Sequence, residues 1–302
     1  MQLQAHSKVG ARIKLIVRKA SDDSIARETD WFHNLVLNTG LARMSTGTWI
    51  DRCCVGTGNS TPLATQISLD SFVASTTTKQ STSSVQNTSS APYYYGASIT
   101  WRFGQGVAAG NISEVGLGWS DSDLWNRALI KDANGDPTTI TVLSDEYLDV
   151  VSEIRVYPAQ NISGSFNLLD KTGAVISTHT YTGVPYITSR RNADFAQVYL
   201  GGTTYPMYIY TGTVGEITSN PSGTGYSITN LTKLYPTANS VRAVVSLDLN
   251  DVVATHQSFQ VLSYNLATDR DGYQLQISPA ITKTSSQIMT YTFELSWGRY
   301  TG

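Results

Sequence analysis

Apolar and polar residues alternate over many short stretches of the chain, which is the pattern of β-strands with one buried face. The clearest stretch is residues 289–297, where Thr290, Thr292 and Glu294 separate five large apolar residues. We expect this strand to have one face in a core and the other in water. Its predicted core side chains are Met289, Tyr291, Phe293, Leu295 and Trp297.

Similar alternation recurs along the rest of the sequence. In residues 148–156 the apolar positions fall on one face and Asp149, Glu153 and Arg155 on the other, and residues 241–249 repeat the pattern. Many short strands at a spacing of about 8–12 residues indicate a β-sandwich or barrel. Shorter runs predict further strands at residues 13–17, 99–103, 115–119, 124–130, 259–264 and 273–277.

Turn-forming residues separate the predicted strands. Asn134-Gly135 is the strongest signal, because both residues tolerate the positive φ of a tight hairpin turn. We expect it to join residues 124–130 to residues 138–143. Only residues 35–44 read as a short helix.

A domain boundary is predicted near Tyr157-Pro158, because proline cannot continue a strand ladder. We therefore expect an all-β protein of two antiparallel, jelly-roll-like β-sandwich domains, residues 1–158 and 159–302, with at most one short helix. The last strand, residues 287–299, either completes the second domain or returns to the first. The sequence leaves both arrangements open.

One polar segment stands apart from the alternating runs. Residues 75–90 are nearly all Ser, Thr, Gln and Asn, so they bury too little apolar surface to order themselves, and we expect an exposed excursion. It leads into Tyr93, Tyr94 and Tyr95, of which at least one would face away from its own core if the three are extended. We predict that they form an interface with a neighbouring subunit or partner protein. The alternative is a mobile loop with tyrosines on its own surface.

Composition narrows the class of protein. The 302 residues carry a net charge of −2 and only 15% charged residues, with 17 tyrosines. Clustered basic surface, which nucleic-acid binding requires, is missing from the sequence, and Arg190-Arg191 reads as a solvated pair. No apolar stretch is long enough for a membrane span, and the first residues do not resemble a signal peptide. We expect no nucleic-acid partner, no membrane insertion and folding in a reducing cytosol.

The sequence also lacks recognisable catalytic chemistry. Its four histidines sit in no known motif, and Gly56-Thr57-Gly58 lacks the third Gly and the Lys of a phosphate loop, so it reads as a loop between strands. Adjacent Cys53 and Cys54 cannot easily form a disulfide and lack a neighbouring His for zinc, so they read as small buried hydrophobes. We expect no catalytic residue, no cofactor and no metal.

Two acidic clusters have alternative interpretations. Asp132, Asn134 and Asp136 have the oxygen spacing of a calcium loop, but the Gly is misplaced and no Glu closes the loop, so a turn is the better interpretation. Asp121 and Asp123, between Trp119 and Trp125, would suit either a carbohydrate subsite or a turn whose Trp residues face the core. We favour the turn.

Several stretches together carry a family resemblance. They are GNISEVGLGW at residues 110–119 with LWNRALI at 124–130, TDWFHNLVLNTGL at 29–41, VGTG at 55–58, and the ending at 293–299. These stretches resemble a family of tailed-bacteriophage virion proteins, usually labelled tail fibre or minor tail proteins. The resemblance covers most of residues 11–157 and 272–299, whereas residues 158–271 match no family.

The resemblance implies a non-enzymatic structural protein of the phage tail, such as a collar, adaptor, fibre or baseplate component. Such a protein would assemble in the bacterial cytoplasm, form a homo-oligomer, either a trimer or a ring, and dock other tail proteins. The alternative is a receptor-binding adhesin, with residues 158–302 contacting a host surface glycan through loops around Tyr205, Tyr208 and Tyr210. A polysaccharide depolymerase is the weakest alternative, because the sequence shows no solenoid repeats.

Overall fold

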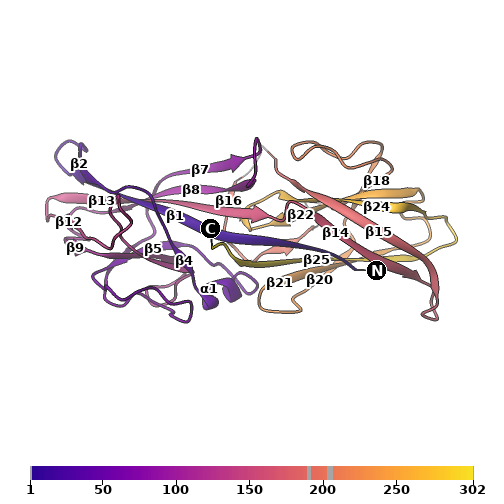
Figure 1. The fold of residues 1–302 in the computed structure, drawn as a ribbon, viewed down its shortest axis with the longest axis horizontal. Coiled ribbons are helices and arrows are strands. Elements are labelled where there is room, and N and C mark those ends of the chain that lie inside the picture. Colours follow the sequence, from indigo (N-terminus) through magenta and orange to yellow (C-terminus); the bar gives the residue numbers. More distant parts are fainter. Residues whose placement is uncertain (1, 189–191, 203–206, 302) are drawn as a thin grey trace.

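The computed structural model describes residues 2–188, 192–202 and 207–301. The described chain consists of β-strands and one six-residue helix, α1 (Asn38–Arg43), so the predicted all-β class with one short helix is confirmed. The molecule is elongated, with an N-terminal lobe at one end and a C-terminal lobe at the other (Figure 1).

The N-terminal lobe is a sandwich of two sheets. The strands β1, β13, β8 and β7 form one layer, and a five-stranded sheet in the order β4-β11-β10-β5-β6 forms the other. Its strands are β1 (Gln2–Lys19), β2 (Ile25–Glu28), β3 (Phe32–His33), β4 (Leu35–Val36), β5 (Arg52–Gly56), β6 (Phe72–Thr76), β7 (Lys79–Asn87), β8 (Tyr94–Phe103), β9 (Gly110–Ile112), β10 (Glu114–Gly118), β11 (Asn126–Leu129), β12 (Ile140–Val142) and β13 (Glu146–Pro158).

The C-terminal lobe packs a second sheet against the other end of the same large layer. This sheet has the order β14-β15-β24-β22-β18-β19, with β17 paired to β22. The strands of this lobe are β14 (Ile162–Leu169), β15 (Val175–Tyr186), β16 (Ala193–Asp194), β17 (Tyr199–Leu200), β18 (Met207–Tyr210), β19 (Gly225–Ile228), β20 (Leu231–Leu234), β21 (Ser240–Leu247), β22 (Thr255–Tyr264), β23 (Ala267–Thr268), β24 (Asp271–Thr282) and β25 (Met289–Arg299).

The two lobes share one sheet, ordered β20-β21-β25-β1-β13-β8-β7. Residues 2–9 of β1 pair in parallel with β25, and residues 7–19 pair antiparallel with β13, so one strand runs through both lobes. β25 also pairs antiparallel with β21. The predicted boundary at residue 158 therefore marks the end of β13 and the start of the second lobe. It does not separate two independent sandwiches, because buried residues from both lobes form one core cluster.

The alternation in β25 is observed as predicted. Its five inward side chains are at most 7% exposed, and the intervening residues are half-buried or exposed. In β13 the apolar face is buried as expected, but Asp149 and Glu153 on the other face are only 2% and 5% exposed. Arginines cover them: Arg18 and Arg102 bind Asp149, and a second pair binds Glu153. The ion pairs explain why this face is buried despite its charges.

Other predictions need correction. The turn at Asn134-Gly135 exists, with a φ of +86° at Gly135, but it closes only the bridge between Lys131 and Pro137. β12 then leaves its expected partner β11 and pairs with β9. Asp132 Oδ1 accepts hydrogen bonds from the backbone N–H groups of Asn134 (2.9 Å) and Asp136 (3.0 Å). These bonds support the turn interpretation of this segment over the calcium-loop interpretation.

The polar segment is also more ordered than predicted. Residues 75–90 contain the end of β6 and the whole of β7, which is hydrogen-bonded along β8. Its side chains are mostly exposed, as expected, but the backbone forms an edge strand. The ladder to β8 supplies the order that its side chains cannot supply by burial.

Candidate functional site

Tyr94 and Tyr95 are the first residues of β8, and Tyr93 directly precedes them. Tyr95 is 1% exposed and belongs to the core. The guanidinium of Arg155 lies 4.1 Å from the centre of the Tyr94 ring, and the Tyr157 ring lies 5.7 Å from it. Tyr93 is half-buried against the core. Tyr95 is therefore not available to a partner, which corrects its predicted place in an interface, and that prediction now rests on Tyr93 and Tyr94.

The sheet edge beside these tyrosines is β7. Its sequence KQSTSSVQN carries a single charge, and Nζ of Lys79 lies 5.1 Å from the centre of the Trp101 ring. Edge strands are commonly protected from pairing with other chains by charges, proline or bulges. β7 has a register shift between Lys79 and Ser81 but little charge. It is therefore the polar last strand of this sheet, and it has little charge.

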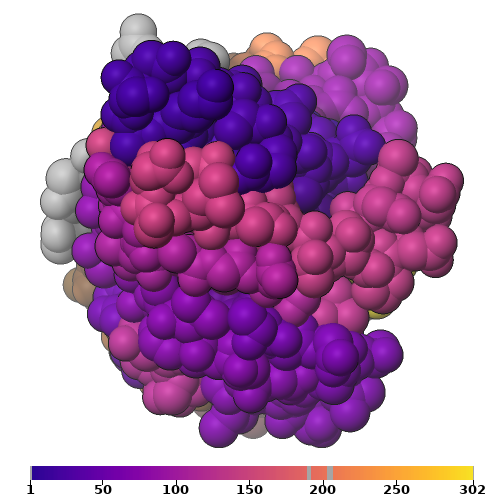
Figure 2. Space-filling model, turned by 90° about the vertical axis from the view of Figure 1, so that its left-hand side faces the viewer, coloured from indigo at the N-terminus to yellow at the C-terminus, as the bar shows by residue number. Residues whose placement is uncertain are grey.

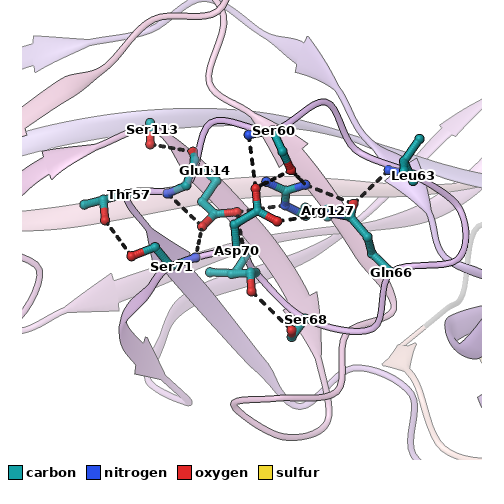
Figure 3. A network of polar contacts seen from close by, with 12 residues as sticks. Thr57, Ser60, Leu63, Gln66, Ser68, Asp70, Ser71, Ser113, Glu114 and Arg127 are labelled. Carbon is teal, nitrogen blue, oxygen red and sulfur yellow. Dashed lines mark hydrogen bonds and ion pairs between the residues drawn. The ribbon is translucent and has the colours of Figure 1, made fainter.

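A buried ionic network organises the loop that connects β5 to β6 (Figure 3). The side chains of Arg127, from β11, and Glu114, from β10, are both 0% exposed, and Nε of Arg127 donates to Glu114 Oε2 at 2.7 Å. Burying two charges is costly unless they are paired and further hydrogen-bonded. Glu114 also accepts backbone N–H groups of Gly58 (2.9 Å), Ser71 (2.8 Å) and Asp70 (3.1 Å), which satisfies its oxygens.

The other end of Arg127 fixes the same loop. Nη2 donates to Asp70 Oδ2 at 2.6 Å and Nη1 donates to Gln66 Oε1 at 2.9 Å. Gly58 fits because a Cβ there would lie 2.4 Å from Glu114 Oε1. Gly56-Thr57-Gly58 is therefore a structural loop, as predicted, and we call this set of contacts the Arg127 clamp. The clamp fixes the loop of residues 57–71 between β5 and β6.

The clamped loop and the strand after it expose large apolar side chains. Leu63 is 59% exposed, Ile67 50%, Phe72 45% and Val73 37%. Alternation could not predict them, because apolar residues that are isolated in a polar loop or at the end of a short strand have no periodicity. Their presence on a loop held by buried charges indicates a surface of fixed shape.

A second apolar surface lies at the far tip of the C-terminal lobe. The hairpin between β14 and β15 and the loop before β25 enclose a groove of about 470 Å³. Leu169 is 50% exposed, Ile176 63% and Ile288 67%, and all three line the groove, which we call the tip groove. Contiguous exposed apolar patches often mark contact surfaces, so these three grouped side chains make the groove a candidate for one.

The opposite end of the molecule is also partly apolar. Ile25 at the start of β2 is 52% exposed, Leu143 after β12 is 50%, and Val107 is 53%. Figure 2 looks onto this end, where the indigo segment that includes β2 lies beside the pink segment that includes β12. Nε of Arg27 donates to the carbonyl oxygen of Thr141 at 3.0 Å and connects the two segments. Exposed apolar side chains are thus present at both ends.

The proposed turn at Asp121 and Asp123 is observed. Arg52 binds Asp121 with Nη1 at 2.6 Å, and the backbone N–H of Trp119 donates to the carbonyl of Asp123 at 3.1 Å. Trp125 is 0% exposed, so its ring faces the core and cannot serve a sugar. The carbohydrate-subsite interpretation does not fit this arrangement.

The cysteines and two of the tyrosines singled out in the sequence lie in strands. Cys53 and Cys54 are free and buried, and burial raises the pKa of the Cys54 thiol to about 12. Tyr208 and Tyr210 lie in strand β18 and not in a loop, and Tyr210 is 8% exposed. Tyr205 and Arg190-Arg191 lie outside the described residues.

Within the part of the chain that the structure describes, no group of three or more His, Cys, Asp or Glu side chains is arranged to hold a metal ion. The described residues also contain no helix long and apolar enough to cross a membrane. Comparisons with family models, with curated proteins and with solved structures found no match to this chain.

Proposed function

We propose that this chain is a non-enzymatic structural component of a bacteriophage tail, which associates with copies of itself and docks other tail proteins in the virion. The resemblance of residues 11–157 and 272–299 to tail proteins motivates the proposal. The residues that carry it are framework here: Glu114 and Arg127 form the clamp, and Trp125 fills the core.

One observation carries the proposal: apolar side chains are exposed at both ends of an elongated molecule. The tip groove presents Ile176 and Ile288, and the opposite end presents Ile25, Val107 and Leu143. Two different surfaces at opposite ends suit head-to-tail contacts, which form closed rings when the rotation between copies closes. A ring or trimer fits the symmetry of a tail.

Sedimentation velocity tests this association. We expect the protein to sediment as a homo-oligomer at micromolar concentration and Ile176→Glu to shift it toward the monomer, because a charge in an apolar contact is desolvated without a partner. Ser165→Glu is the matched control, since Ser165 is an exposed residue of β14 in the same lobe. The control should have the same distribution of sedimentation coefficients as the wild-type protein.

Two results would count against the proposal. If the wild-type protein sediments as a monomer across the micromolar range, the proposed self-association is contradicted. If Ile176→Glu leaves the oligomer as intact as Ser165→Glu does, the tip groove is not part of the interface.

A further inference from the structure

A pocket of about 400 Å³ lies where the end of β25 and Tyr300 run beside β1, and the C-terminus is near the middle of the molecule (Figure 1). Pockets that hold small molecules have volumes of about 300–1,000 Å³. We call it the waist pocket. Its lining includes Arg12, His33, Asn34, Arg155, Tyr157 and Arg299.

The wall of the waist pocket carries excess positive charge. Arg12 and Arg155 share one carboxylate, Glu153, at 2.6 and 2.7 Å. Arg299 donates instead to two neutral oxygens, the Val36 carbonyl and Asn38 Oδ1, and has no ion pair among the described residues. Three guanidinium groups against one carboxylate leave an excess of two positive charges.

The electrostatic field of these cations acts on a neighbouring imidazole. Although His33 is exposed at the surface, partial desolvation of its ring lowers its pKa, and the nearby charges of Arg155, Arg12 and Lys131 lower it further. His33 is therefore neutral near pH 7. An anion in the pocket would oppose the repulsion that the cations exert on a protonated His33.

Asn34 supplies an unused donor at the same place. Its Oδ1 accepts the backbone N–H of Ala11 at 2.7 Å, whereas its Nδ2 is buried and has no hydrogen-bond partner in the described structure. A buried donor without a partner costs about 1–3 kcal/mol, and such groups call for an explanation. Asn34 lines the pocket, so a shift of its side chain on ligand binding would let this amide donate to a ligand oxygen.

An aromatic wall completes the pocket. The rings of Tyr157 and Tyr300 stack at 3.8 Å with an interplanar angle of 10°, and both residues line the cavity beside Leu35 and Gly10. Inorganic anions are polar on every side and gain nothing from such a wall. A sugar ring has an apolar face that packs against it.

We propose that the waist pocket binds a sugar acid, with the carboxylate held by the Arg299 guanidinium and the Asn34 amide and the ring against the tyrosines. Guanidinium groups match the planar geometry of a carboxylate and keep their charge at all relevant pH values. This site is separate from the two apolar ends, so it does not depend on self-association.

Isothermal titration calorimetry at low ionic strength tests the proposal with three probes. Glucuronic acid should bind at one site per chain with a dissociation constant below about 1 mM. Glucose, which has a similar ring without the carboxylate, and inorganic phosphate, which has charge without the ring, should each bind at least about tenfold more weakly. Phosphate binding as tight as that of glucuronic acid would overturn the sugar-acid assignment, and so would equal binding of glucose.

Variants locate the site. Arg299→Gln should weaken glucuronic acid binding at least about tenfold, but Arg299 also holds the backbone at Val36. His33→Glu provides an independent test, because His33 is exposed and its side chain makes no hydrogen bond in the described structure, so the new charge repels the ligand without removing a contact. Gln80→Glu adds a negative charge to the exposed edge strand β7 and is the matched control.

The expected pattern is loss of glucuronic acid binding in His33→Glu, wild-type binding in Gln80→Glu, and similar melting temperatures for both. Wild-type affinity in His33→Glu would place any binding elsewhere and overturn the proposal. Equal loss in both variants would show a general charge effect and would overturn it as well.

Discussion

At the scale of single residues, Arg127 shows how this sequence uses a buried charge. Its guanidinium reaches Glu114, Asp70 and Gln66, and these contacts bring a loop and two strands together. Buried ion pairs contribute little net stability compared with an apolar replacement, but they require a specific partner geometry. The position of the loop, and of the apolar side chains it exposes, depends on this geometry.

We predict that Arg127→Met destabilises the protein by about 3–5 kcal/mol, because it leaves the Glu114 carboxylate buried without its cation. Arg52→Met is the control: Arg52 pairs with Asp121 at the surface, where such a pair contributes about 0–1 kcal/mol. Urea unfolding measures both. A loss for Arg127→Met no larger than for Arg52→Met would mean that the clamp is not a buried network.

A second residue-scale prediction concerns pH. His256 is 0% exposed, its Nδ1 lies 2.5 Å from Tyr291 Oη, and burial lowers its pKa. The unfolded chain, with a histidine pKa of about 6.5, therefore binds a proton before the folded protein does as the pH falls. The contribution of the neutral imidazole to the free energy of unfolding is therefore fully present above the pKa of the unfolded state and decreases as the pH falls below it.

We therefore expect the unfolding free energy to fall between about pH 7.5 and 5.5, and His256→Gln to reduce this slope. Some slope should remain, because the pKa values of His6 and His33 are lowered too. Denaturant melts at a series of pH values give the comparison. An unchanged slope in His256→Gln would show that its protonation is not coupled to folding.

At the scale of elements, strict alternation allowed β25 to be predicted from sequence, whereas the first half of β1 was missed. Residues 2–9 of β1 are paired with β25, but their inward row includes Ser7, which is 0% exposed and hydrogen-bonded to Tyr273 Oη at 2.7 Å. A polar residue in the buried row breaks the hydrophobic pattern. Its partner, Tyr273, is distant in sequence, so local pattern could not identify it.

The element-scale prediction tests the inward face of β25. Phe293 is 1% exposed and its ring lies 5.2 Å from that of Phe259, so Phe293→Ala should cost about 3–5 kcal/mol. Thr290→Ala, at an exposed position of the same strand, should change stability by about 0.5 kcal/mol or less. Similar losses from the two substitutions would contradict the facing of this strand.

The candidate contact surfaces show a different limit of sequence reasoning. Tyr93 and Tyr94 could be selected because aromatic residues follow a polar segment, but the cation over Tyr94 comes from β13. The tip groove combines residues near 169, 176 and 288, which only the pairing of distant strands brings together. Sequence alone identified candidates within one segment and could not identify surfaces built from several.

At the scale of the whole molecule, the shared sheet makes the two lobes interdependent. β1 spans both lobes, and residues from Leu3 to Trp297 contribute to one core cluster. We expect a single cooperative thermal transition, with the calorimetric and van't Hoff enthalpies equal. Two resolved transitions in differential scanning calorimetry would instead indicate that residues 1–158 and 159–302 fold as separate domains.

The elongated framework, its apolar ends and the waist pocket would allow a tail protein to join its neighbours and hold a small ligand independently. The association and binding experiments examine these properties separately. The central claim is that the protein is located in the tail of a phage particle.

The most direct test is electron microscopy of purified tailed particles labelled with gold-conjugated antibodies raised against this chain. The particles should come from cells that produce the protein. The account predicts gold at a fixed position on the tail in most intact particles. Unlabelled tails, with the protein recovered only in the soluble fraction of the same lysate, would contradict it.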